Sequence, residues 1–363
     1  MNFCRIFSAA LFFLVVSVSY AADIEGLYEA QVPVKTQVQS ERFQVYPEAL
    51  AQVIVKISGD TSAPERPLLA STVAAARRLV QQYHYIELVE GESPALAEQG
   101  YTHKLVVQFD GESLTHKLVE AGVPLWGRTR PEVLVLLAVE DREVRYVLAA
   151  NASAEMESYV ENASLRRGLP TLLPLMDLED QRHFSFADVW GGFYASISPV
   201  VQRYGVDSVL LGRLLRESDG GWQARWSLLD GSDRIHWASE ANSQGLAVDG
   251  GIDGAADHIA LRFAQVFTMD VNSTISIAVS GVVDLASYAN LLGYLQSLDG
   301  ASEVKVKEVR GTDMLFDVAL LTSRESLSRD IALGTTLLPV IENDQNIGVG
   351  QSNPNKLVYR LQP

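Results

Sequence analysis

Cysteine is almost absent from this sequence. The single one among its 363 residues is Cys4, which lies in an apolar N-terminal stretch and lacks the upstream apolar run of a lipidation site. Without other thiols the chain has no disulfide bonds, thiolate metal site or cysteine nucleophile. If this N-terminal stretch is removed on export, the mature chain has no cysteine. An exported protein of this size without cysteine fits a bacterial periplasm better than a eukaryotic secretory route.

Long apolar runs are equally scarce. One exists, IFSAALFFLVVSV at 6–18, with Arg5 before it and the small residues Ser19 and Ala21 after it. This pattern is typical of a secretory signal peptide, and the run is short for a membrane span. We expect residues 1–21 to be cleaved during export to the periplasm, leaving no integral membrane segment. The alternative is a short uncleaved anchor.

Positive charge is in deficit. The chain has 29 lysines and arginines against 45 aspartates and glutamates, a formal net charge of −16. The acidic residues are spread along the chain without a block or tail, which favours a role in solubility. Because duplex nucleic acid repels such a surface, we expect no nucleic-acid partner.

Periodicity and turn signals predict a mixed α/β, or α+β, protein of three small units in series. The first unit, 22–125, has amphipathic helices at 40–58 and about 67–82, the first with a start that Pro47 should delay or kink. The second unit, 126–270, is a mixed sheet, and the third, 271–363, is ferredoxin-like.

The middle unit divides into two patterns. A strand at 132–139, a helix at 154–167 and a strand at 171–177 predict a parallel βαβ arrangement. A helix at about 188–204 leads to an antiparallel meander, closed by a helix at 253–267. The meander strands are 207–215, 222–229 and 234–239. In the third unit a βαββαβ pattern ends in a strand at 356–361, after a polar linker at 342–355.

Motifs for catalysis are missing. The strand at 132–139 is followed by EDREVRYVL, which lacks the glycines of a nucleotide-binding loop, and neither an HExxH nor a G-x-S-x-G motif occurs. DGGIDGAAD at 249–257 resembles a calcium loop but has Ala260 where the bidentate glutamate belongs. We therefore expect no cofactor.

One histidine is a candidate metal ligand. His183 lies in DLEDQRHFSFAD, where Asp177 and Asp180 could add carboxylates to a mixed metal site. The alternative interpretation is a polar loop before a helix. Convergence of these three side chains in a pocket with another histidine would favour an enzyme.

A corner at PLWGRTRP combines Trp126, Arg128, Arg130 and Pro131. Packing of an arginine over the indole would explain it, and Pro131 stiffens the entrance to the next strand. We interpret the corner as a structural joint in which Trp126 and Arg130 hold the first unit against the second. The alternative is a partner-binding surface.

Several segments resemble one family, an uncharacterised envelope family of Gram-negative bacteria, domain of unknown function 2066. They include LYEAQVPV, ALAQVIVKISGD, PLWGRTRPEVLVLLAV, GLPTLLPLMDLED and RYGVDSVLLGRL. The resemblance implies an envelope location but no reaction, cofactor or catalytic residue. The middle unit is also similar to accessory domains of envelope machinery, such as the curli secretion lipoprotein.

Together these features favour an exported, periplasmic, non-catalytic interaction or accessory protein of the Gram-negative envelope, with an envelope protein as partner. The alternative is a metal-dependent hydrolase acting on an envelope polymer, centred on His183.

Export can be checked directly. Because the apolar run is short and Ala21 ends a small-residue site, the mature protein should begin near Ala22 or Asp23 and appear in a detergent-free periplasmic extract. N-terminal sequencing and fractionation measure this. Full-length protein retained in membranes would instead support the anchor.

Overall fold

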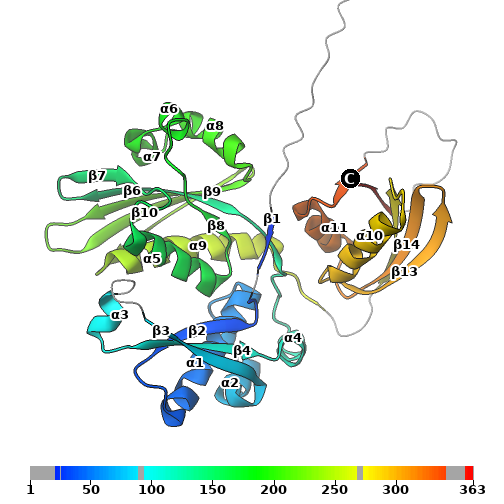
Figure 1. The fold of residues 1–363 in the computed structure, drawn as a ribbon, viewed down its shortest axis with the longest axis horizontal. Helices are drawn as coiled ribbons and strands as arrows, with labels where there is room; N and C mark the ends of the chain where they lie inside the picture. The colour runs from blue at the N-terminus through cyan, green and yellow to red at the C-terminus, as the bar shows by residue number, and fades with distance from the viewer. Residues whose placement is uncertain (1–20, 25, 89–93, 268–272, 341–355, 363) are drawn as a thin grey trace, which may run out of the picture.

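The computed structural model describes residues 21–24, 26–88, 94–267, 273–340 and 356–362 (Figure 1). The predicted signal, apart from Ala21, and the linker at 342–355 lie outside the described residues. Sheets of three, six and five strands follow one another along the chain, each with its own helices. The predicted mixed α+β class, with small units in series, is confirmed.

The first unit is a three-stranded antiparallel sheet in the order β2-β4-β3. Its core forms between alternate residues of β2 and β4 and the long helix α1. The elements are β2 (Glu29–Val34), α1 (Gln39–Ser58), α2 (Pro67–Ala74), β3 (Val80–Glu87), α3 (Pro94–Glu98), β4 (His103–Phe109) and α4 (Gly111–Glu120).

Two details of the first unit differ from the prediction. Pro47 does not delay α1, which begins at Gln39, because burial of the helix face around Leu50 and Ile54 outweighs one lost backbone hydrogen bond. The helix predicted at 67–82 ends at Ala74 and passes through a 3₁₀ turn into β3.

The middle unit is a mixed sheet in the order β11-β10-β9-β6-β7, with β8 also beside β6. β6 is parallel to β8 and β9, whereas β9, β10 and β11 form the antiparallel meander. Helices α5 and α9 cover one face, and α6, α7 and α8 cover the other (Figure 1). Buried on both faces, β6 reads as one continuous apolar run.

The bounds of the middle elements follow. The strands are β6 (Val133–Asp141), β7 (Val144–Val147), β8 (Thr171–Leu172), β9 (Ser208–Arg216), β10 (Trp222–Asp230) and β11 (Asp233–Ala241). The helices are α5 (Ala154–Arg167), α6 (Asp180–His183), α7 (Phe186–Gly191), α8 (Tyr194–Tyr204) and α9 (Gln244–Phe263).

Glycines explain where the helix bounds differ from the prediction. The helix predicted at 188–204 is two helices, because Gly192 adopts φ +66° and ends α7. Helix α9 starts earlier than predicted and includes the glycine-rich 249–257 segment. A Cβ on Gly251 would lie 2.4 Å from the ring of Trp226. Glycine at this position therefore allows α9 to pack closely against the sheet, and the glycine-rich segment is helix and not loop.

The strand predicted at 171–177 is also shorter than expected. Only Thr171 and Leu172 pair with β6. Pro174 follows and has no backbone N–H to donate to a strand neighbour, so the chain leaves the sheet.

The third unit has the sheet order β13-β14-β12-β16-β15. The neighbours β13-β14-β12-β16 have the strand order of a ferredoxin-like sheet, but β16 is parallel to β12. In a ferredoxin-like βαββαβ unit, two helical crossovers and one hairpin make the last strand antiparallel to the first. The extra edge strand β15 reverses the chain once more, so β16 enters in the opposite direction.

The elements of this unit are β12 (Ser273–Ser280), α10 (Leu285–Ser297), β13 (Ala301–Arg310), β14 (Asp313–Leu320), α11 (Arg324–Leu333), β15 (Leu337–Pro339) and β16 (Lys356–Leu361). A short ribbon of β1 (Ala21–Asp23) and β5 (Thr129–Pro131) places the predicted mature N-terminus against the corner.

Trp226 is 1% exposed in the core between β10 and α9. Trp226→Ala should therefore lower the free energy of unfolding by about 3–5 kcal/mol, measured by denaturant unfolding. Arg225→Ala, at the exposed neighbouring position, should change it by less than about 0.5 kcal/mol. Equal effects of both substitutions would show that the indole does not support the core.

Candidate functional site

Arg130 lies where two helices end. Its side chain is fully buried. Nη2 donates to the Lys56 carbonyl (2.8 Å), and Nη1 donates to the carbonyls of Gly168 (2.7 Å) and Arg167 (3.2 Å). These carbonyls terminate α1 and α5, where the backbone oxygens lack partners and the helix dipole is negative. One cation thus caps a helix of the first unit and a helix of the second.

The same guanidinium fixes the corner itself. It donates to the carbonyls of Gly127 (2.8 Å) and Trp126 (2.9 Å) and stacks 3.9 Å from the centre of the Trp126 ring. The Trp126 backbone N–H donates to the Ile57 carbonyl at 2.6 Å. Trp126 and Arg130 therefore both bind the end of α1.

Glycine is required beside this guanidinium. Gly168 ends α5 with φ +60°, and a Cβ there would lie 2.6 Å from Nη1 of Arg130. Both the backbone conformation and the space exclude a larger residue.

Lys56 adds a second buried cation. It is 7% exposed, and Nζ donates to the Glu29 carbonyl at 2.7 Å. Burial, with repulsion from Arg130, lowers the pKa of Lys56 to about 8. Burial likewise lowers the pKa of Arg130 to about 9, an effect that Asp299 opposes. Both groups remain charged at neutral pH.

Two adjacent arginines tie α5 to α9. Arg167 is fully buried and pairs with Asp257 at 2.5 Å, while also donating to the Gly59 carbonyl. Arg166 pairs with Asp249 (3.0 Å) and Asp253 (2.9 Å). The aspartates of the segment that resembled a calcium loop thus bind arginine.

The corner also contacts the third unit. The Arg128 backbone N–H donates to Oδ2 of Asp299 at 2.9 Å, and a Cβ on Gly127 would lie 2.5 Å from the same oxygen. The Arg128 side chain is exposed.

Gln265, after α9, makes a further link. Its Nε2 donates to both carboxylate oxygens of Asp330, at 2.9 and 3.0 Å, and its Oε1 accepts from Thr322 at 2.9 Å. Since Gln265 is 6% exposed, this contact between the second and third units is shielded from water.

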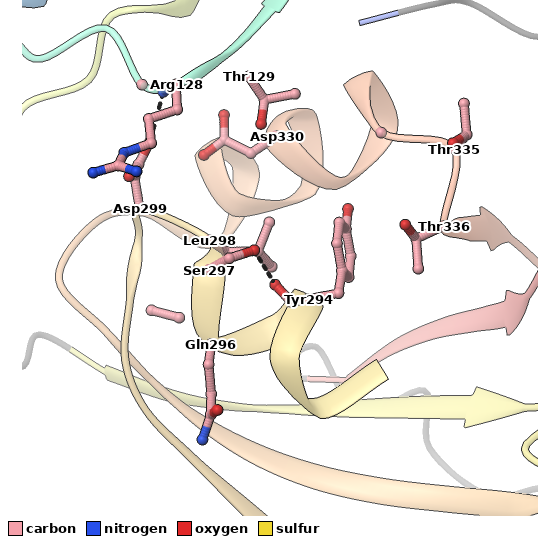
Figure 2. A pocket seen from close by; sticks show the side chains of 13 residues that line it. Arg128, Thr129, Tyr294, Gln296, Ser297, Leu298, Asp299, Asp330, Thr335 and Thr336 are labelled. Atoms are coloured by element: carbon pink, nitrogen blue, oxygen red, sulfur yellow. Dashed lines mark hydrogen bonds between the residues drawn. The ribbon is translucent and has the colours of Figure 1, made fainter. Parts of the chain in front are cut away.

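A polar cavity of about 640 Å³ lies between the corner and the third unit (Figure 2). Its side chains come from the corner, from α10 and α11 and from the residues that follow these helices. They include several hydroxyls, the carboxylates of Asp299 and Asp330, the Gln296 amide and the Arg128 guanidinium. Burial raises the pKa of Asp330 to about 6; the negative charge of Asp299 acts in the same direction, whereas the Gln265 hydrogen bond opposes it.

The structure does not assemble a metal site around His183. Arg203 binds both Asp177 (2.6 Å) and Asp180. This pairing keeps the pKa of Asp177 far below its usual range, and the His183 side chain is exposed. Across the part of the chain that the structure describes, no three His, Cys, Asp or Glu residues lie close enough to hold a metal ion.

Sequence reasoning missed Lys56, Asp299, Gln265 and Asp330. Lys56 had a signal, since it lies three residues after the buried Val53 and so falls on the apolar face of α1. The others are polar residues far apart in the sequence, and no spacing rule connects them.

Comparison with known proteins identifies one family over the first unit. Residues 21–127 match the family described as domain of unknown function 8605 (DUF8605). The resemblance to domain of unknown function 2066 is therefore wrong. No curated protein is similar to the chain in sequence.

Among solved structures, the homoserine dehydrogenase of S. aureus aligns with 13% identity and a TM-score of 0.13. The alignment spans 49% of this chain and 49% of the dehydrogenase. So low a TM-score carries no information about fold or activity. Within the described residues no helix is long and apolar enough to cross a membrane.

Arg130→Lys should destabilise the protein by at least about 2 kcal/mol, because one ammonium cannot serve all the carbonyls around Arg130 and each buried carbonyl without a donor costs about 1–3 kcal/mol. Arg128→Lys, on the exposed side of the same corner, should change stability by less than about 0.5 kcal/mol. Urea unfolding measures both. Similarly small losses of stability in both variants would contradict the interpretation of the corner as a structural joint.

The raised pKa of Asp330 gives a pH dependence. The folded protein binds this proton more tightly than the unfolded chain, so the stabilisation is complete below the ordinary pKa and is lost as pH rises through about 6. The wild type should lose melting temperature between pH 5 and 7.5 relative to Asp330→Asn. If melting temperature changed with pH in the same way in both proteins, the raised pKa would not belong to Asp330.

Proposed function

We propose that this protein is an exported, periplasmic, non-catalytic interaction protein of the Gram-negative envelope. The observation that carries the proposal is the polar cavity at the junction of the second and third units. Its lining, among the described residues, offers hydroxyl groups, the carboxylates of Asp299 and Asp330 and the guanidinium of Arg128. These groups can donate and accept hydrogen bonds at once, which suits recognition of a polar partner.

The joints support the same proposal. Arg130 holds the first unit to the second, and Asp299 and Gln265 hold the third unit to the corner. A cavity built by two units keeps its shape only if those units keep their relative positions. Preorganisation of this kind strengthens binding because less conformational freedom is lost on association.

The apolar 6–18 segment supports export. The envelope assignment no longer has the support of a family resemblance, so it rests on this segment and on the lack of cysteine after Cys4.

Site-specific crosslinking in intact cells tests the proposal. A photoreactive residue would replace one exposed glutamine in each unit: Gln81 on β3, Gln202 on α8 and Gln296 on α10. We expect a discrete protein adduct, dependent on light, from at least one position. Cells kept in the dark are the control.

The hydrolase alternative makes a different prediction for the same protein. It requires stoichiometric bound metal and polymer cleavage that His183→Ala abolishes. That result, with no adduct from any of the three positions, would overturn the interaction proposal.

A further inference from the structure

We propose that the junction of the three units binds an extended segment of the partner protein in which an apolar side chain stands next to a lysine or arginine. This inference rests on the proposed function and names the surface and the chemistry of its partner. It stands on two cavities that adjoin at the corner and differ in character.

The first cavity is apolar and has a volume of about 270 Å³. Its lining comes from all three units and includes Leu27, Ile57, Val119, Leu125, Trp126 and Phe267. A cavity of roughly 150 Å³ already holds a benzene ring. This cavity therefore has room for one leucine or phenylalanine side chain.

Trp126 lines this cavity and carries a buried hydrogen-bond donor. Among the described residues its indole Nε1 has no hydrogen-bond partner. The opposite edge of the indole faces α1, since a Cβ on Gly59 would lie 3.3 Å from Cε3, so Nε1 points away from that helix. Buried indole N–H groups usually have a partner, and a backbone carbonyl of a bound segment would be one.

The second cavity is the polar one of about 640 Å³ in Figure 2. It carries hydroxyl groups and two carboxylates, of Asp299 and Asp330, against one guanidinium, of Arg128. With a pKa of about 6, Asp330 is mostly ionised at neutral pH. Carboxylates and hydroxyl oxygens together accept hydrogen bonds from an ammonium or guanidinium group.

Both cavities include Gly127 and Asp299 in their linings. The two cavities thus adjoin at the corner. In an extended chain neighbouring side chains point to different sides. A peptide with an apolar residue beside a basic one therefore offers one side chain to each cavity.

Peptide binding to the full-length protein tests this inference. The probe is N-acetyl-Phe-Lys-amide, with N-acetyl-Phe-Glu-amide, N-acetyl-Ser-Lys-amide and spermidine as comparisons. Protein labelled with ¹⁵N at its five tryptophans gives one NMR signal for each indole N–H. The Trp126 signal is identified by its loss in Trp126→Phe.

We expect the Phe-Lys probe to shift the Trp126 signal downfield and to saturate it. Gln296→Lys places a positive charge at the polar cavity and should weaken binding at least tenfold. Gln202→Lys makes the same substitution at an exposed position on α8 and should leave binding unchanged. Equal binding of Phe-Lys and Phe-Glu, binding of spermidine alone, or no Trp126 shift at millimolar probe would each overturn the inference.

The crosslinking experiment separates this inference from the proposed function. If adducts form from Gln81 or Gln202 while the Phe-Lys probe does not bind, the interaction role stands and this surface is wrong. If no position gives an adduct, the interaction role fails whatever the probe does.

Discussion

The guanidinium of Arg130 satisfies the ends of two helices that belong to different units. Its hydrogen bonds to the carbonyls of Lys56, Arg167 and Gly168 place a buried positive charge at two negative helix termini. Among the described residues the guanidinium is held by helix and corner carbonyls and by the Trp126 ring, and these contacts offset the cost of burying the charge. The direction of α1 relative to the middle sheet follows from this contact, and so does the position of the corner on which the third unit docks.

The corner makes contacts with both the first and the third unit. Towards the first unit, Trp126 binds the end of α1; towards the third, the Arg128 backbone binds Asp299. Glycine at 127 is what allows Asp299 to approach so closely. The apolar and polar cavities adjoin at this point, since Gly127 and Asp299 line both. A structural joint and a binding surface, which were alternatives for the corner from sequence, are therefore compatible: Arg130 supports the joint, and the cavities flank Gly127.

The carboxylates that suggested chemistry are held by arginines. Asp177 and Asp180 bind Arg203, and Asp249 and Asp253 bind Arg166. These pairs fix helices to their neighbours within the middle unit. Asp330 differs, because its partner is the neutral amide of Gln265. Burial raises the pKa of Asp330, and the hydrogen bond from this neutral amide only partly opposes that effect.

The sequence by itself determined the elements whose residues interact locally. The positions of β6, β10 and α5 were readable from sequence because side-chain period and helix-end chemistry are properties of neighbouring residues. Only the tertiary structure decided the rest. Gly251 and Gly254 belong to a helix because tryptophans from another strand lie against them, and β16 runs parallel to β12 because β15 takes the edge of the sheet. Asp299 and Asp330 share a cavity with the corner although some 170 and 200 residues separate them from it in sequence. Such contacts depend on how whole units dock, and no short-range pattern encodes that docking.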